Sequence, residues 1–219
     1  HFPIQNLPFG IFTHPRSLNP RVGVAIGNLV LDLAELEKRG ILSDFQYDES
    51  IFSSASLNGL MRQGRDTWSR LRKRLIELLS AEGDEIRDNQ ELRDAVLLPQ
   101  SECKMQLPVE VPDYTDFYSA RHHATNVGTM LRGAENALQP NWLHLPVAYH
   151  GRSSSLIPTD IDVHRPHGQL AENKYGPSRA IDFELEMGFF VGTETTLGEP
   201  IAISNAADHI FGMVLVNDW

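Results

Sequence analysis

The sequence predicts a mainly β protein with some α-helix, in which a small N-terminal module precedes a strand-dominated second part. Two β-prone runs flank Gly27-Asn28, a dipeptide typical of a tight hairpin turn. From Ile181 to Met187 charged and apolar residues alternate strictly, which is the pattern of a β-strand. Residues 66–79 instead repeat their apolar side chains at helical spacing.

The N-terminal module is predicted to contain a hairpin followed by helices. The hairpin covers residues 21–33, and a short helix from Leu33 to Arg39 ends at Gly40. The helix of residues 66–79 carries arginines and a lysine opposite its apolar side chains. This basic face has two interpretations, a nucleic-acid patch or a solvated helix surface. The acidic remainder of the chain favours the solvated surface.

A domain boundary is predicted near residues 100–112, where prolines interrupt the pattern. Aromatic residues, histidines and glycines become frequent after it. The predicted domains are residues 1–105, a small α/β or barrel-like module with helices, and residues 106–219, a strand-dominated domain that carries the specific chemistry.

The composition limits the partners and the setting of the protein. The net charge of −10 argues against nonspecific binding to nucleic acid or to an anionic membrane. No apolar run approaches the roughly 20 residues that a membrane helix needs. The chain has one cysteine, Cys103, so an internal disulfide is excluded and a reducing, cytoplasmic setting is predicted. Cys103 lies in no recognisable nucleophile motif, and a passive thiol is the favoured interpretation.

The alternating segment near residue 184 concentrates negative charge on one side of its predicted strand. Asp182, Glu184 and Glu186 share one face, whereas the apolar side chains share the other. The continuation into Phe189-Phe190-Val191 predicts that this strand becomes buried. Two interpretations stay open: a carboxylate site for Ca²⁺ or Mg²⁺, or acids on a solvent-facing edge strand that prevent sheet-to-sheet pairing.

Two further aspartates could complete such a site. Asp218 ends a predicted apolar strand that begins at Ile210. Asp116 lies where an extended segment meets a predicted helix, and an aspartate at such a place is more often the N-cap of the helix than a metal ligand. Together with Glu184 and Glu186, these residues would form an oxygen-rich set of metal ligands drawn from three segments.

The helix predicted to run through about Leu131 carries His123. Histidine is the usual general base for activating water, although a histidine on a helix is more often a surface or packing residue. Two later residues, Arg132 and Tyr149, offer a guanidinium and a phenol that would suit an anionic, oxygen-rich substrate.

Several longer runs of the sequence resemble the fumarylacetoacetase family. The similarity covers nearly all of the chain and is densest after residue 113. The runs are Asp-Tyr-Thr-Asp-Phe-Tyr-Ser at 113–119, His-Ala-Thr-Asn-Val-Gly at 123–128, Asn-Trp-Leu-His-Leu-Pro at 141–146, Tyr-His-Gly-Arg at 149–152, Arg-Pro-His-Gly-Gln at 165–169, Glu-Leu-Glu-Met at 184–187 and Asn-Asp-Trp at 217–219.

The resemblance implies hydrolysis of the carbon–carbon bond of 4-fumarylacetoacetate to fumarate and acetoacetate, the last step of tyrosine and phenylalanine catabolism. It implies an anionic diketo-acid substrate and a homodimer. The implied fold is a small SH3-like barrel followed by a mixed β-roll. The implied site has His123 as general base, Tyr118, Arg132 and Tyr149 as substrate contacts, and Ca²⁺ or Mg²⁺ held by Asp116, Glu184, Glu186 and Asp218.

Family members continue beyond the Asn-Asp-Trp motif and place further functional residues there. We therefore expect that this chain is a segment of a longer enzyme, with the first part of the β-roll. Two alternatives remain at this point. One is another superfamily member, an acylpyruvate hydrolase or a dienoate isomerase, and the other is an inactive cation-binding fragment.

Overall fold

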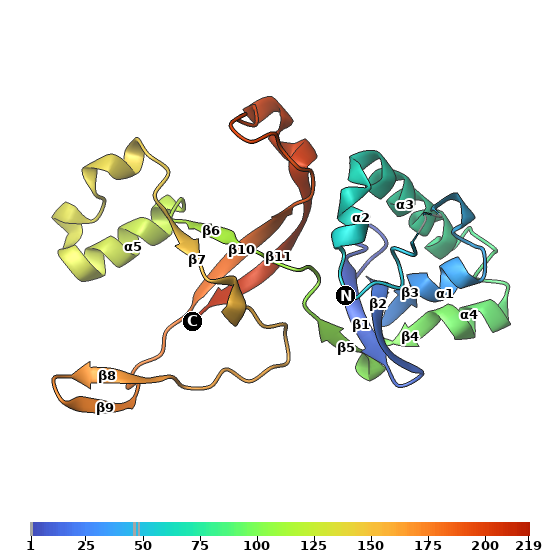
Figure 1. Ribbon diagram of the computed structural model, residues 1–219, viewed down its shortest axis with the longest axis horizontal. Helices are drawn as coiled ribbons and strands as arrows, with labels where there is room; N and C mark the ends of the chain where they lie inside the picture. The colour runs from blue at the N-terminus through green and yellow to red at the C-terminus, as the bar shows by residue number, and fades with distance from the viewer. Residues whose placement is uncertain (1, 46, 48) are drawn as a thin grey trace. The chain divides into compact units, whose positions relative to one another are not determined.

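The computed structural model describes residues 2–45, 47 and 49–219 (Figure 1). Contacts between residues divide the chain into two compact units, one made of His1–Glu110 with Pro158–Trp219 and the other of Val111–Ile157. This division describes which residues contact one another and does not test the predicted domains, residues 1–105 and 106–219, which stay a prediction. Strands and helices contain comparable numbers of residues, which confirms the predicted combination of strands and helices.

The first unit contains a five-stranded antiparallel sheet in the order β4-β3-β2-β1-β5. The predicted hairpin is confirmed, because Ile26 pairs with Leu29 and Gly27 takes a positive φ of 58° at the turn. This sheet corresponds to the predicted SH3-like module. Its strands are β1 (Phe9–His14), β2 (Ser17–Ile26), β3 (Leu29–Asp32), β4 (Leu97–Pro99) and β5 (Lys104–Gln106).

The helices of this unit form where the apolar spacing predicts them. The helix predicted at Leu33 is confirmed, and Gly40 follows it with a positive φ of 77°. The longest helix, α3, buries Trp68, Leu71 and Leu75 along one face. The helical segments are α1 (Leu33–Lys38), η1 (Ser43–Phe45), α2 (Asn58–Arg62), α3 (Gly64–Leu79), α4 (Gln90–Val96), η2 (Gln100–Glu102) and η6 (Ile203–His209).

Arginines on the basic face of α3 form hydrogen bonds with neighbouring loops, whereas the favoured prediction was a face exposed only to solvent. Arg72 donates hydrogen bonds to the carbonyl oxygens of Gln5 and Leu7. Arg74 forms a bidentate pair with Glu85, at 2.7 and 2.8 Å. The arginines of this face therefore fasten flanking loops to the helix, and this use was not visible in the sequence.

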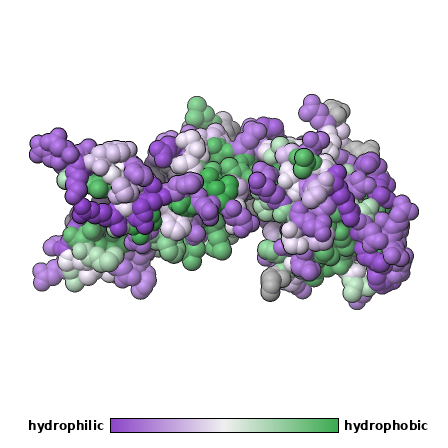
Figure 2. Space-filling view, turned by 90° about the horizontal axis from the view of Figure 1, so that it is seen from below, coloured by the Kyte–Doolittle hydropathy of each residue, from purple (hydrophilic) through white to green (hydrophobic). Residues whose placement is uncertain are grey.

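Two hairpins complete the first unit: β8 (His167–Ala171) with β9 (Lys174–Pro177), and β10 (Glu184–Val191) with β11 (Ile210–Asp218). The prediction that β10 becomes buried is wrong, because Phe189 and Val191 remain 55% and 56% exposed. Both side chains lie on the same face of the strand, and this apolar face stays exposed. Figure 2 shows hydrophobic residues at the surface of the molecule.

The second unit is built from one hairpin and one main helix. Strands β6 (Tyr114–Phe117) and β7 (Ala148–Gly151) pair antiparallel, and α5 (Arg121–Arg132) follows β6. The helix buries Ala124 and Gly128 but leaves Leu131 73% exposed. Three short 3₁₀ segments fill the connections: η3 (Ala134–Asn136), η4 (Pro140–Leu143) and η5 (Ser153–Ser155). Among the described residues no helix is long and apolar enough to cross a membrane.

A buried ion pair connects the hairpin of the first unit to α1. Arg21 and Asp32 are only 8% and 4% exposed, and the guanidinium Nε donates to a carboxylate oxygen at 2.7 Å. The other oxygen of Asp32 accepts from the backbone N–H of Glu35 at 3.1 Å, which caps the helix. The guanidinium also lies over the ring of Phe12. One carboxylate thus neutralises a buried cation and starts a helix.

Replacing this carboxylate should therefore destabilise the first unit strongly. We expect Asp32→Ala to lower the free energy of unfolding by about 3–5 kcal/mol, because Arg21 would stay buried without its partner. Asp32→Asn keeps an N-cap oxygen and should lose less. Urea unfolding measures both, with Asp88→Ala, which breaks an exposed pair with Arg87, as the control of little effect. Equal midpoints for Asp32→Ala and Asp88→Ala would contradict this account.

Burial raises the pKa of the Cys103 thiol to about 11, and the neighbouring Arg21 offsets this only in part. The thiol packs against the core cluster of Phe12, Val30 and Leu98, and it donates a hydrogen bond to the carbonyl of Pro99. Both findings agree with the predicted passive thiol.

The raised pKa predicts slow alkylation of Cys103 at neutral pH. Because the folded state favours the neutral thiol, its contribution to stability is present below about pH 9 and is lost as the pH rises through about 11. Peptide mass spectrometry after iodoacetamide treatment should show little labelling of Cys103 at pH 8 and much more at pH 11. Unfolding in urea should restore labelling at pH 8, and equally fast labelling of the folded protein at pH 8 would refute the shift.

Candidate metal and substrate site

The pairing of β10 with β11 brings acidic side chains to one face of the ribbon. Glu184 lies opposite Asp218, and Glu186 lies opposite Val216. Cross-strand partners share a face, as do residues two apart on one strand. Glu184, Glu186 and Asp218 therefore face the same side, as the alternation predicted for the two glutamates.

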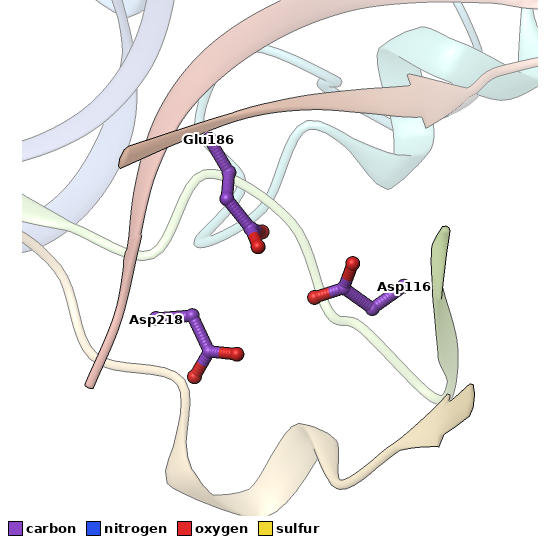
Figure 3. Close-up of side chains that lie close together, drawn as sticks. All are labelled: Asp116, Glu186 and Asp218. Carbon is purple, nitrogen blue, oxygen red and sulfur yellow. The ribbon is translucent and has the colours of Figure 1, made fainter. Parts of the chain in front are cut away.

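Glu186 and Asp218 come close enough to share a cation, since their carboxylate oxygens lie within 4.8 Å of each other (Figure 3). Two unit negative charges about 4 Å apart repel by roughly 1 kcal/mol in water and by about 4 kcal/mol near a protein surface. Calcium binds oxygen at about 2.3–2.6 Å, so two oxygens on one ion lie no more than about 5 Å apart. The pair therefore fits a hard divalent cation.

The alternative interpretation, acids that guard an exposed sheet edge, is less consistent with Glu186. Its side chain is half-buried, whereas the apolar neighbour Leu185 on the opposite face is 70% exposed. Acids that only prevent edge pairing would be more exposed than the apolar residues on the opposite face. The ligand role of Glu184 stays a prediction.

Asp116 lies in the second unit, on β6, and is a further carboxylate of the predicted ligand set. It pairs in register with Tyr149 on β7, and the phenol donates to a carboxylate oxygen of Asp116 at 2.9 Å. The alternative role of Asp116 as an N-cap is excluded, because Ala120 occupies that position of α5. One carboxylate oxygen of Asp116 is thus oriented by the neighbouring strand.

The predicted base His123 is the third residue of α5 and lies against Tyr118. The two rings meet edge to face, with centroids 5.5 Å apart and an angle of 81° between their planes. The Tyr118 hydroxyl donates to the carbonyl of Ala124 at 3.2 Å. The structure thus brings together a predicted base and a predicted substrate contact.

Arg132, the last residue of α5, forms hydrogen bonds with the segment that follows the helix. Its guanidinium donates to the carbonyl oxygens of Asn136, at 3.1 Å, and Ala137, at 2.7 Å. These contacts use two of the five N–H donors of the group. The remaining donors suit the carboxylate of a substrate.

The sequence did not predict two polar contacts that hold this unit together. The indole of Trp142 donates to the carbonyl of Tyr118 at 2.8 Å, and His150 forms an ion pair with Asp113 at 2.8 Å. Both residues lie in runs typical of the family, but neither run reveals a partner. Such contacts depend on chain folding between β6 and β7 and carry no periodic signal.

Gly128 allows the chain after α5 to pass directly against the helix. A Cβ atom built on Gly128 would lie 1.8 Å from the carbonyl oxygen of Ala137, which is far inside van der Waals contact. Because the obstacle is backbone, it cannot turn aside as a flexible side chain could. The close approach at Gly128 therefore fixes how α5 packs in its unit.

Substitution of this glycine should reverse the usual effect of alanine in a helix. Gly→Ala in a helix interior normally stabilises by up to about 1 kcal/mol. We expect Gly128→Ala to destabilise by about 1–3 kcal/mol instead, because the Ala137 backbone must move. Thermal unfolding followed by circular dichroism measures this change. Gly168→Ala is the control of little effect, since nothing lies within 4 Å of its built Cβ; a stabilising Gly128→Ala would contradict the clash.

Comparison with known protein families assigns both parts of the chain. The family model described as "Fumarylacetoacetase N-terminal" matches residues 5–108. The model described as "Fumarylacetoacetate (FAA) hydrolase C-terminal" matches residues 114–219.

Curated relatives give the same assignment. The chain is 49% identical to a fumarylacetoacetase of Dictyostelium discoideum over 226 residues, and 49% identical to one of Bos taurus over 223 residues. It is 47% identical to the fumarylacetoacetase of Homo sapiens over 223 residues. Each comparison covers 100% of this chain and 53% of the relative, so the chain spans about half the length of these relatives. The chain belongs to the fumarylacetoacetase family.

Proposed function

We propose that the protein containing this chain hydrolyses the carbon–carbon bond of 4-fumarylacetoacetate to fumarate and acetoacetate, at the end of tyrosine and phenylalanine catabolism. The observation that carries the proposal is the identity of 47–49% to fumarylacetoacetases along the whole chain. Because the chain spans about half of those relatives, the activity is proposed for the full-length protein.

The cation site is proposed to consist of Asp116, Glu184, Glu186 and Asp218. All four are carboxylates, and such hard oxygen donors suit Ca²⁺ or Mg²⁺ better than softer metals. The proximity of Glu186 to Asp218 supports the assignment, as does the orientation of Asp116 by Tyr149. When bound, the cation would supply positive charge for the diketone oxygens of the substrate and for the enolate that leaves.

His123 is proposed to take a proton from the attacking water on a ring nitrogen. Its position in the first turn of α5, with the Tyr118 ring against it, restricts the directions that the imidazole can face. Tyr118 and Tyr149 are proposed to contact the substrate. Arg132 is proposed to bind a substrate carboxylate with the N–H groups that do not serve Asn136 and Ala137.

The organisation of the whole protein is proposed from the same family membership. We propose that residues 1–105 form the SH3-like module and that residues 106–219 begin the catalytic β-roll. We also propose a cytoplasmic homodimer, with no nucleic-acid or membrane partner.

Release of fumarate from fumarylacetoacetate by the full-length protein tests the proposal. We expect His123→Ala to lower kcat by about 10²–10⁴-fold, the usual contribution of a general base. The neighbouring exposed histidine provides a matched control, since His122→Ala should leave kcat nearly unchanged. Chelation of divalent cations should abolish turnover, and added Ca²⁺ or Mg²⁺ should restore it.

Two outcomes would contradict this function. Pyruvate release from acylpyruvates, without fumarate release from fumarylacetoacetate, would indicate another activity of the superfamily. Equal turnover by wild type and His123→Ala would remove His123 from the mechanism even if fumarate is released.

A further inference from the structure

We propose that Trp142 is a positioning residue that holds the backbone of Tyr118 and, through it, fixes the orientation of His123. The inference rests on the proposed function, in which His123 is the general base. It assigns a role to a residue that makes no contact with substrate or metal in that scheme. All the residues concerned lie in the second unit.

The first step is the double attachment of Tyr118. Its carbonyl accepts a hydrogen bond from the indole Nε1 of Trp142 at 2.8 Å, and its N–H donates to the carbonyl of Val147 at 2.8 Å. Tyr118 lies between the end of β6 and the start of α5, where no regular hydrogen-bond ladder holds the backbone. The two external hydrogen bonds therefore define the peptide groups on both sides of its Cα atom.

The position of the Tyr118 backbone also affects the imidazole of His123. A backbone held on both sides determines where the Tyr118 ring lies, and the ring meets His123 edge to face at 5.5 Å. The Tyr118 hydroxyl also bonds the carbonyl of Ala124, the residue after His123. Tyr118 thus contacts the first turn of α5 at two points, and loss of the Trp142 hydrogen bond would loosen both.

The third step is the rigidity of the donor. Trp142 belongs to the 3₁₀ segment η4, which starts at Pro140, and its own N–H donates to the carbonyl of Gln139 at 2.9 Å. Proline fixes φ, so few backbone conformations remain open to this segment. Tryptophan is only a donor, and its N–H lies far from the backbone, so it can reach a carbonyl 24 residues away in sequence.

The decisive variant is Trp142→Phe in the full-length protein, which keeps an aromatic ring and removes the N–H. We expect kcat to fall about ten- to a hundredfold, because small misplacements of a catalytic group have effects of this size. KM should rise less than kcat falls, since Tyr118, itself a proposed substrate contact, keeps its side chain. Trp68→Phe is the matched control: Trp68 also donates its indole N–H to a backbone carbonyl, that of Leu60 at 2.9 Å, but in the first unit. It should lower stability and leave kcat per folded molecule unchanged.

A second comparison separates positioning from simple destabilisation. If Trp142 acts through His123, Trp142→Phe should have no further effect on kcat in a His123→Ala background. The histidine ring protons, observed by NMR, should also shift in Trp142→Phe, because they lie in the ring current of Tyr118. If Trp142→Phe fails to fold, benzothienylalanine at position 142 keeps the bicyclic shape and removes only the N–H.

The outcomes distinguish this inference from the proposed function. A wild-type enzyme without fumarate release would refute the proposed function, while the NMR comparison would still test whether Trp142 orients His123. An active wild type with wild-type kcat and unshifted histidine signals in the folded variant would overturn the inference. An equal loss of kcat in the His123→Ala background would overturn it as well.

Discussion

The antiparallel register of β10 with β11 is the constraint on which the acidic site depends. With Glu184 opposite Asp218, the acids from both strands face one side, which Val216 shares, and Leu185, Met187 and Phe189 face the other. A slip by one residue would turn every side chain of a strand to the opposite face. The register therefore gathers the acids on one face of the ribbon, and it brings Glu186 within reach of Asp218.

A comparable role belongs to the pairing of β6 with β7 in the second unit. That pairing sets Tyr149 against Asp116 and leads the chain directly from Asp116 into the segment that carries Tyr118 and His123. Gly128 and the Arg132 guanidinium then hold the chain after α5 close to the helix. Groups proposed for metal binding, proton transfer and substrate binding thus share one short hairpin-and-helix frame.

Outside the β10–β11 ribbon, charged groups of the first unit lie beside groups of opposite charge or beside carbonyl oxygens. There Arg72 and Arg74 of α3 and the buried Arg21 are matched with carbonyl oxygens or carboxylates, so they stabilise loops and a helix terminus. In the acidic pair of the ribbon, Glu186 and Asp218, like charges lie close together instead. Proteins accept such repulsion where a bound cation can offset it, and this contrast points to function more than the net charge does.

The sequence by itself determined the local elements and the chemical nature of the site. Period-two alternation, helical spacing and the Gly27-Asn28 turn predicted the main strands and helices, because these patterns depend on neighbouring residues alone. Family-specific runs identified the candidate site residues. Only the tertiary structure decided which of them meet, that Asp116 is not a helix cap, that β10 exposes its apolar face, and that Trp142 holds Tyr118. Those outcomes depend on strand register and on contacts between distant segments, for which a single sequence contains no periodic signal.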